Sequence, residues 1–442
     1  MIRYLVLLAF AGTAMAGERA GVAAQVITPN RPIWLAGYAS RNKPSEGKAH
    51  ELYAKAVALE DAAGTKLVFV STDLIGLPKS LADDVAKKVQ AKTGLPRANL
   101  MLTSSHTHSG PVLRENLADM YEIPPEQLKY LHEYTARLGE QLVDVVVRAL
   151  ADLRPATLEH GHGRATFAIN RRQVTDKGVV IGRNPAGPVD HSVPVLVVRG
   201  EDRAVRALVF GYACHNTTLA YYKLCGDYAG FAQAELEAAH NGAVALFWAG
   251  CAADANPDPR GKEDDARAHG KALARAVEDA LAKPLAPVAG SFRAAWEHVE
   301  LDFAAPPTRE QLKADTLSKS YPLRTRAARL LALPGIPTAY PEYPVQAWKL
   351  GDAVLWFALG GEVVVDYALR IRKDTPTKKA LWVTGYANDV MAYIPSRRIL
   401  GEGGYEADSS MVYYGHPTRW ADSVEDRIHA AAQRLVAKLE AK

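Results

Sequence analysis

Short apolar runs that break into polar loops recur along the chain. They lie at 67–70, 100–102, 207–210, 244–248, 354–357 and 381–383. Such runs, bounded by glycine and polar residues, are typical of buried strands. Each leads into a cluster of glycine, hydroxyl, histidine, amide or acidic residues. The pattern therefore predicts buried strands that carry polar side chains just beyond their carboxyl ends.

Helical periodicity fills the stretches between these runs. Apolar residues recur at helical spacing over 81–92, 125–153, 226–239, 264–282 and, near the end of the chain, 424–439. Strands that alternate with helices predict an α/β fold. In such folds ligands gather beyond the carboxyl ends of strands, so the polar clusters are the expected place for chemistry.

One segment, 306–343, departs from this alternation. It carries several prolines around a charged helical stretch at 309–333. Long connections of this kind are functional or are plain surface insertions. The sequence leaves open whether this excursion is a lid or rim over a site or only an insertion. Its basic residues are Arg309, Lys313, Lys319, Arg324, Arg326 and Arg329.

The first residues have the pattern of a secretory signal. Arg3 is followed by an apolar run at 4–11 and by Ala14-Met15-Ala16, which predicts a signal peptide over 1–16 with cleavage after Ala16. The run is too short to span a bilayer, and no later stretch reaches that length. We therefore expect export to a periplasm or to the outside, with 17–442 forming a single domain without a transmembrane segment.

Composition narrows the class of protein without naming a function. Of 442 residues, 48% are hydrophobic and 23% charged, which is ordinary for a globular chain and excludes disorder, collagen-like repeats and coiled coil. The net charge of +4 gives no reason to propose a nucleic-acid partner. Cys214, Cys225 and Cys251 are too few for a disulfide framework. One bridge and one free thiol remain allowed, and the sequence does not choose the pair.

His106-Thr107-His108, just after the run at 100–102, is the strongest local motif. On an extended segment, residues i and i+2 point the same way, and two imidazoles on one face suit a transition metal. Such a motif alone is weak, and the chain holds a second one, His160-Gly161-His162. Neither a serine-nucleophile elbow nor a phosphate or dinucleotide loop is present.

Two further residues complete the ligand count of a candidate zinc site. His215 follows the run at 207–210, and Glu362 follows two glycines after the run at 354–357, where a helix over 363–371 is expected. Glu362 is either a ligand or a cap for that helix. A catalytic zinc needs about three protein ligands and an open position, a count that His106, His215 and Glu362 satisfy.

The heptapeptide Ser105-His106-Thr107-His108-Ser109-Gly110-Pro111 resembles the signature of the neutral/alkaline ceramidase family, which are zinc-dependent amidases. The similarity extends along most of the chain after the signal, through 21–29, 50–56, 71–74 and Ile169-Asn170-Arg171-Arg172. It implies an α/β catalytic domain in which helices flank mixed β-sheets and the zinc site lies at strand ends.

The resemblance also implies roles for individual residues. The zinc ligands would be His106, His215, Glu362 and Tyr393, holding one zinc per chain. His108 would be the base that takes a proton from the zinc-bound water. Tyr405, in the Tyr405-Glu406 pair twelve positions after Tyr393, and Arg171 would contact the substrate and the developing oxyanion.

Two departures from the family pattern bear on the substrate. Longer relatives have Gly-Asp-x-Ser-Pro-Asn where this chain has Ala253-Asp254-Ala255-Asn256-Pro257, so the serine is gone. Those relatives also carry an Ig-like C-terminal domain, whereas this chain ends soon after Tyr405. A membrane-docking role for that domain is therefore not transferred.

The expected function is an exported zinc-dependent amidohydrolase that cleaves an N-acyl amide, such as ceramide or a related N-acyl lipid, by attack of a zinc-activated water. One alternative is a zinc hydrolase for a small polar amide, ester or lactone. Another is a non-catalytic binding protein that contains zinc. Peripheral membrane contact stays open, and the sequence says nothing about oligomeric state.

Overall fold

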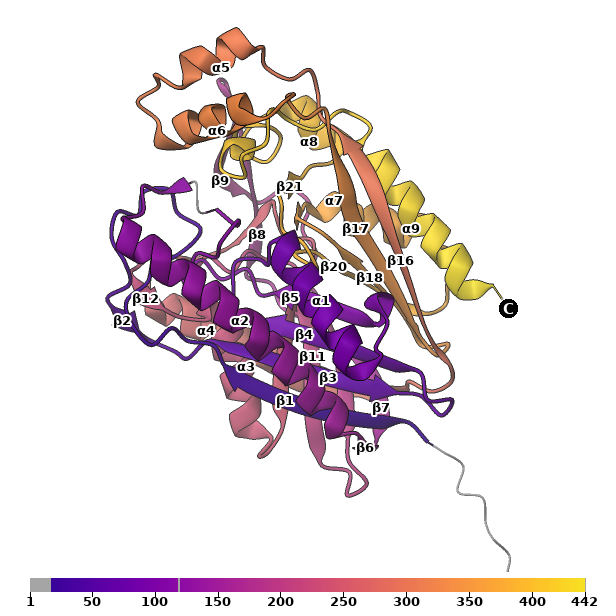
Figure 1. Ribbon diagram of the computed structural model, residues 1–442. Helices are drawn as coiled ribbons and strands as arrows, with labels where there is room; N and C mark the ends of the chain where they lie inside the picture. The colour runs from indigo at the N-terminus through magenta and orange to yellow at the C-terminus, as the bar shows by residue number, and fades with distance from the viewer. Residues whose placement is uncertain (1–16, 118–119, 442) are drawn as a thin grey trace, which may run out of the picture.

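The computed structural model describes residues 17–117 and 120–441 (Figure 1). The expected signal peptide, 1–16, therefore lies outside the described residues. Three larger sheets build the fold, and helices cover them. These elements confirm the expected α/β class with mixed sheets.

The first sheet has the strand order β5-β4-β3-β1-β6. Its strands are β1 (Arg19–Val26), β3 (Tyr53–Glu60), β4 (Lys66–Thr72), β5 (Leu100–Ser104) and β6 (Arg154–Pro155). Two helices, α1 (Lys79–Thr93) and α2 (Pro125–Ala151), cover its outer face. The β4–β5 pair is parallel, so both strands end at the same edge.

The second sheet has the order β13-β11-β10-β7-β15. Its strands are β7 (Thr157–Arg164), β10 (Ser192–Arg199), β11 (Val205–Tyr212), β13 (Val244–Ala249) and β15 (Ala286–Pro287). The helices α3 (Asp227–Ala239) and α4 (Glu263–Leu281) pack on its outer face. Here β11 and β13 form the parallel pair.

The third sheet has the order β16-β17-β18-β20. Its strands are β16 (Phe292–Asp302), β17 (Ala339–Leu350), β18 (Val354–Leu359) and β20 (Ala380–Thr384). The helices α7 (Val365–Asp374) and α9 (Val424–Glu440) cover it, and β18 runs parallel to β20.

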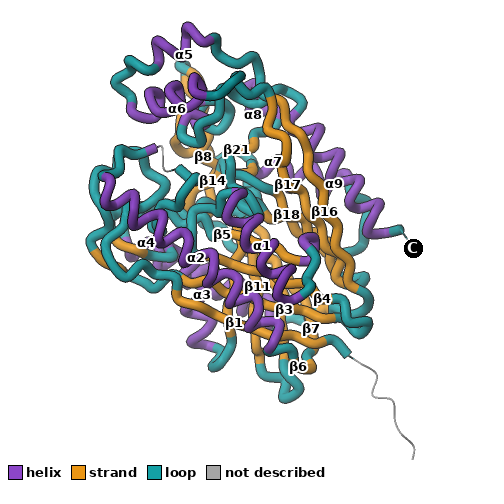
Figure 2. The backbone as a smooth tube through the Cα atoms, in the orientation of Figure 1, coloured by secondary structure: helices purple, strands orange, loops and turns teal. Residues whose placement is uncertain are grey.

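A three-stranded sheet of order β14-β8-β9, the strand pairs β12-β2 and β19-β21, and short helices complete the described chain. The additional strands are β2 (Gly47–Lys48), β8 (Ala168–Thr175), β9 (Gly178–Asn184), β12 (Lys223–Leu224), β14 (Ala255–Pro257), β19 (Glu362–Val363) and β21 (Tyr393–Ile394). The additional helices are α5 (Arg309–Asp315), α6 (Tyr321–Ala332), α8 (Arg397–Glu402) and the 3-10 turns η1 (Arg97–Asn99) and η3 (Ser409–Val412). Figure 2 shows α5, α6, α8, β8, β14 and β21 in the upper half of the view.

The inner faces of the three sheets share one core. Phe69 of the first sheet, Trp248 of the second and Trp356 of the third are almost completely buried together. The ring centroids of Phe69 and Trp356 lie 5.0 Å apart, and those of Trp248 and Trp356 lie 5.6 Å apart. Burying each ring stabilises the fold by roughly 1.5–3 kcal/mol. This core fixes the three sheets relative to one another.

The three parallel pairs end at one common region. An isolated bridge joins Thr103 at the end of β5 to Ala387 after β20, and another joins Gly250 after β13 to Thr384. The loops that follow β5, β11 and β18 are thereby brought together. These are the loops that the sequence singled out for chemistry.

The excursion differs in detail from its prediction. The expected helical stretch, 309–333, is two helices, α5 and α6, because Pro322 lies in the first turn of α6 and favours a new helix start. The chain returns to the sheet at Ala339, the first residue of β17, so the excursion is shorter than 306–343. Figure 1 shows α5 and α6 at the top of the molecule, beyond the edge of the sheets.

None of the helices within 17–117 and 120–441 is long and apolar enough to cross a membrane. Cys214, Cys225 and Cys251 are all buried free thiols. The sequence left open whether two of them pair, and the structure shows no disulfide among the three.

Candidate metal centre

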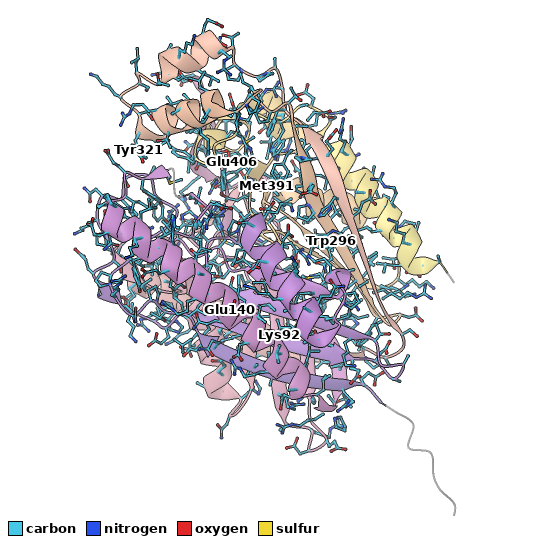
Figure 3. All side chains as sticks on the ribbon, in the orientation of Figure 1. Lys92, Glu140, Trp296, Tyr321, Met391 and Glu406 are labelled. Atoms are coloured by element: carbon cyan, nitrogen blue, oxygen red, sulfur yellow. The ribbon has the colours of Figure 1, made fainter. Side chains whose placement is uncertain are left out.

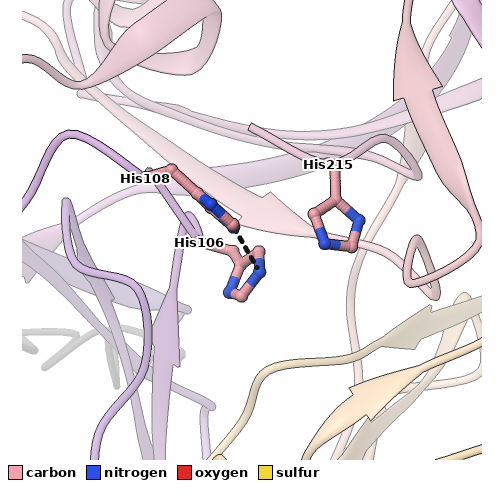
Figure 4. A group of neighbouring side chains, drawn as sticks. All are labelled: His106, His108 and His215. Atoms are coloured by element: carbon pink, nitrogen blue, oxygen red, sulfur yellow. Dashed lines mark hydrogen bonds between the residues drawn. The ribbon is translucent and has the colours of Figure 1, made fainter. Parts of the chain in front are cut away.

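Three buried histidines lie where strands end. His106 follows β5, and His108 stands two residues later, while His215 follows β11. Figure 4 shows the three rings turned toward one another. His106 has a φ of 61°, in the left-handed region that non-glycine residues rarely adopt. Backbone strain of this kind is found at functional sites, where the surrounding structure holds it in place.

Backbone carbonyls orient two of these rings. Nδ1 of His106 lies 2.6 Å from the carbonyl oxygen of Ile75, and Nδ1 of His215 lies 2.8 Å from that of Ala252. A carbonyl oxygen only accepts, so each Nδ1 must donate a proton. In the neutral imidazole, Nε2 is then left as an acceptor. Metal-binding histidines in proteins are commonly held this way.

Glu362 adds a carboxylate oxygen to the two imidazole lone pairs. All three atoms are hydrogen-bond acceptors, and none of them is a donor. Its Oε2 lies 3.0 Å from Nε2 of His106 and 3.2 Å from Nε2 of His215. Within the described chain, Oε2 has no hydrogen-bond donor although it is buried. Two imidazole lone pairs and a carboxylate oxygen at this spacing repel one another unless a cation lies between them. The donor set therefore fits a bound metal ion.

The electrostatics keep these groups in the forms that bind metal. Burial, followed by the positive charge of the nearby Arg171, lowers the pKa of His215 to about 3, so the ring is neutral at pH 7. Burial raises the pKa of Glu362, whereas positive charge on His106 and His215 lowers it well below its usual range; with both rings neutral, a bound cation would supply that charge. A neutral imidazole and an ionised carboxylate are the protonation states that a metal requires.

His108 lies on the same cluster. Its Nε2 is 3.1 Å from Nε2 of His106, and its buried Nδ1 has no partner among the described residues. Tyr38 packs on the ring with centroids 4.9 Å apart. Gly37 lies against the ring edge, where a Cβ would be 2.3 Å from Nδ1. The three histidines alone could hold a metal ion, so geometry allows His108 to be a third imidazole ligand or a base beside the ion.

Tyr393 approaches the cluster from β21, which pairs with the Glu362 strand β19. Its hydroxyl lies 3.4 Å from Nε2 of His215 and accepts a hydrogen bond of 3.1 Å from Nη2 of Arg171. The Tyr405 ring packs edge-on against Tyr393, with centroids 5.2 Å apart. The structure thus brings together all seven residues that the sequence singled out.

Arg171 is held by several side chains at once. Its Nε donates to Glu406 at 2.7 Å, and its Nη1 donates to Oδ1 of Asn256 at 3.3 Å. Asn256 lies in the segment where longer relatives have Ser and also accepts from the hydroxyl of Thr217. The segment that departs from the family pattern therefore contacts the candidate site through Arg171.

Sequence reasoning missed two residues of the site. The Tyr414 hydroxyl donates to Oε1 of Glu362, the oxygen that faces away from the histidines. The Tyr386 ring packs on His106 with centroids 4.3 Å apart. Neither tyrosine stands in a spacing that signals chemistry. Glu362 itself belongs to β19, and the helix expected to begin there starts at Val365, so Glu362 does not cap it.

A cavity of about 460 Å³ borders the site through Tyr414. Figure 3 labels Met391, which lines this cavity, and Glu406, which binds Arg171. The other lining side chains come from α1, α2, α6, the start of β17 and neighbouring loops. They include Lys79, Arg114, Glu115, His132, Arg329, Tyr340, Asp389, Tyr413 and His416.

The second histidine pair lies elsewhere. His160 and His162 belong to β7 of the second sheet, and no third ligand joins them among the described residues. They do not form a cluster of the kind that surrounds His106.

Comparisons with known proteins agree with these observations. The model of the family described as neutral/alkaline non-lysosomal ceramidase, N-terminal, matches residues 19–263. Neutral ceramidase of Pseudomonas aeruginosa is 26% identical over 226 residues, which cover 49% of this chain and 33% of that protein. Neutral ceramidase B of Dictyostelium discoideum is 25% identical over 248 residues, covering 51% and 33%.

The fold extends the match further along the chain. The crystal structure of the Pseudomonas aeruginosa neutral ceramidase superposes with a TM-score of 0.72 at 20% identity, covering 95% of this chain and 75% of that one. The sequence alignments span about a third of the length of the two curated relatives. Since the family model matches more than half of the residues, the chain belongs to the neutral/alkaline non-lysosomal ceramidase family.

Proposed function

We propose that this protein is a zinc-dependent amidohydrolase that cleaves N-acyl amides. The observation that carries the proposal is the convergence of two imidazole lone pairs and the Glu362 carboxylate on one buried point. Nitrogen and carboxylate ligands of this kind suit zinc, which in catalytic sites keeps one position open. The names of the curated relatives, all neutral ceramidases, supply the reaction class.

The proposed ligands are His106, His215, Glu362 and Tyr393, binding one zinc per chain. When bound, zinc supplies Lewis acidity, which polarises a carbonyl and acidifies water. The Ile75 and Ala252 carbonyls keep Nε2 of His106 and His215 directed at the ion. Arg171 donates to the Tyr393 hydroxyl oxygen, so the hydroxyl proton is directed away from Arg171 and the oxygen stays beside His215.

His108 is proposed as the base. Burial, followed by the neighbouring His106, lowers its pKa well below the ordinary value, so the ring is neutral at pH 7 and has one nitrogen free to accept a proton. Nε2 faces the cluster, and Tyr38 and Gly37 hold the ring from the other side. A base must lie within hydrogen-bond reach of the proton it takes, and this position meets that need.

Tyr405 is proposed to donate to the developing oxyanion, a contribution that is typically worth about 10²–10³ in rate. Arg171 sits beside it, with the guanidinium 5.9 Å from the Tyr405 ring centroid. Because Glu406, Asn256 and Tyr393 already bind Arg171, it adds positive charge near the oxyanion and fixes Tyr393.

Export also forms part of the proposal. The pattern at 1–16 supports a signal peptide, and the secreted or periplasmic protein would begin at Gly17. Residues 17–442 are proposed to act as one catalytic unit, because all three sheets contribute to the site and share one core.

Two substrate classes compete. Ceramide or a related N-acyl lipid follows from the relatives' names. The charged lining of the neighbouring cavity favours a second class, small polar amides, because Lys79, Arg114 and Arg329 stand there among tyrosines. Of the six basic residues of the excursion, Arg329 alone lines that cavity.

The deciding experiment compares two substrate series with matched acyl chains, N-acyl sphingosines and N-acyl amino acids, each assayed with and without a zinc chelator. Each buried methylene is worth about 0.8 kcal/mol, so a lipid amidase should gain roughly fourfold in kcat/KM per added CH₂. A flat profile, with preference for the acidic series and loss of rate in salt, would favour the polar class. Turnover that survives complete zinc removal would overturn the metal mechanism.

A further inference from the structure

The two oxygens of the Glu362 carboxylate have different neighbours. Oε2 faces Nε2 of His106 and of His215, at 3.0 and 3.2 Å. Oε1 accepts a hydrogen bond from the Tyr414 hydroxyl. No other described side chain donates to Oε1. The rotation of the carboxylate about its last bond is therefore set by Tyr414 on one side and the metal cluster on the other.

This asymmetry determines how the carboxylate can bind a metal. A carboxylate free to rotate can present either oxygen or both to an ion. Because Oε1 accepts a hydrogen bond from the Tyr414 hydroxyl, Oε2 alone is directed between the two imidazoles. Hydrogen-bond partners that orient ligands in this way change metal affinity typically 10–100-fold when they are removed.

Tyr414 is itself held in place. It follows η3, and its ring lies 6.5 Å from that of Tyr393. The next residue, Gly415, has a φ of 72° and leaves space for the Arg329 guanidinium, since a Cβ there would meet Nη2 at 1.3 Å. The Tyr414 ring also borders the cavity beside the site. The loop thus fixes the phenol rather than leaving it to rotate.

We infer that Tyr414 is a positioning residue that presents Glu362 to the metal through a single oxygen. The inference rests on the proposed metal site and adds to it a residue that contributes no ligand atom. Tyr414 therefore acts on metal affinity through Glu362, and through the metal on turnover.

Tyr413 provides a matched control. It is the preceding residue and also lines the cavity, but among the described residues no hydrogen bond joins it to Glu362; its ring packs on Tyr405, with centroids 6.3 Å apart. Tyr414→Phe removes the hydroxyl and keeps the ring, so the packing of the loop is preserved. Tyr413→Phe makes the same chemical change without touching the carboxylate.

The test measures zinc dissociation constants of the purified full chain by competition with a chelator of known affinity. Tyr414→Phe should weaken zinc binding by roughly 10–100-fold, and Tyr413→Phe should leave it within about twofold of the wild type. With zinc saturating, Tyr414→Phe should lower kcat and leave KM unchanged. Thermal unfolding of the metal-free forms checks that both variants fold alike.

A double-mutant cycle tests whether Tyr414 changes zinc affinity through Glu362. In the Glu362→Gln background, adding Tyr414→Phe should change zinc affinity little, because the two residues act as one unit. Equal zinc affinities for Tyr414→Phe and wild type, or equal losses in both phenylalanine variants, would overturn the positioning role and leave the proposed function intact. A wild-type chain that binds no zinc would overturn both.

Discussion

At the scale of single residues, the candidate site depends on hydrogen bonds that sequence motifs do not contain. His106 and His215 could be predicted because each stands in a polar cluster after an apolar run. Their orientation comes from the backbone carbonyls of Ile75 and Ala252. Each carbonyl is distant in sequence from the ring it binds, and neither residue belongs to a motif. Tyr414 could not be predicted, because only the folded loop brings its hydroxyl to Glu362.

Substituting the histidines separates ligands from the base. His106→Ala and His215→Ala should each lose zinc and turnover together, because each removes one of the proposed ligands. His108→Ala should keep zinc and lose turnover, because a base serves the reaction and not the ion. Metal-to-protein ratios and rates measured on the same samples check this. His160→Ala, on β7 and away from the cluster, is the matched control and should change neither.

The opposite result for His108 has a definite meaning. If His108→Ala strips the zinc, the ion is bound by the three imidazoles that the geometry also allows. Glu362 would then be the first candidate for the base.

Asp389 provides a prediction about pH. Burial raises its pKa to about 7, while the Tyr340 hydroxyl and Lys79 pull it down and Asp83 pushes it up. The unfolded value is about 3.9. The protonated carboxyl therefore contributes stability that is fully present below about pH 4 and is lost as pH rises through 7.

Asp389→Asn removes this dependence. The variant should lose less free energy of unfolding than the wild type between pH 5 and pH 8, by roughly 1–3 kcal/mol. Urea unfolding at the two pH values measures the difference. Asp352→Asn is the control, since that side chain is 92% exposed. The same pH dependence in Asp389→Asn and wild type would show that the buried carboxyl does not titrate in this range.

At the scale of elements, burial decided which strands could be predicted. The strands β11, β13 and β18 are buried almost throughout and read as continuous apolar runs. The strand β3 is equally buried, but Lys55 interrupts its apolar run. In the fold Lys55 is 3% exposed and its Nζ donates to Glu237 at 2.7 Å and to the Ala245 carbonyl. The sequence around Lys55 does not indicate that a carboxylate 182 residues away will balance its positive charge.

Element boundaries depended on local signals of different strength. The helices α2, α4 and α9 begin and end within about two residues of their predicted bounds, because their apolar periodicity is long. Glu362 was placed at a helix start because it follows two glycines, but pairing with Tyr393 makes it a strand residue. That pairing is a long-range contact, and it also brings a proposed ligand beside the cluster.

At the scale of the whole molecule, the candidate centre is where three sheets meet. His106 follows a strand of the first sheet and His215 follows one of the second, while Glu362 follows β18 of the third. A metal ion bound by these side chains would tie the loops of all three sheets together. Without it, the converging lone pairs repel one another in a buried place, which works against the contact between sheets.

Zinc should therefore stabilise the entire fold and not only the loops that bind it. A ligand that binds the folded state alone contributes about 4 kcal/mol at a free concentration near one thousand times its Kd. Thermal unfolding of chelator-treated protein should shift to a higher Tm as zinc is added, in step with occupancy measured separately. His106→Ala should show no such shift, and His160→Ala should show the full one. If the Tm of the wild type stays the same when zinc is bound, the ion does not stabilise the fold. The contact between the sheets would then depend on the shared tryptophan core alone.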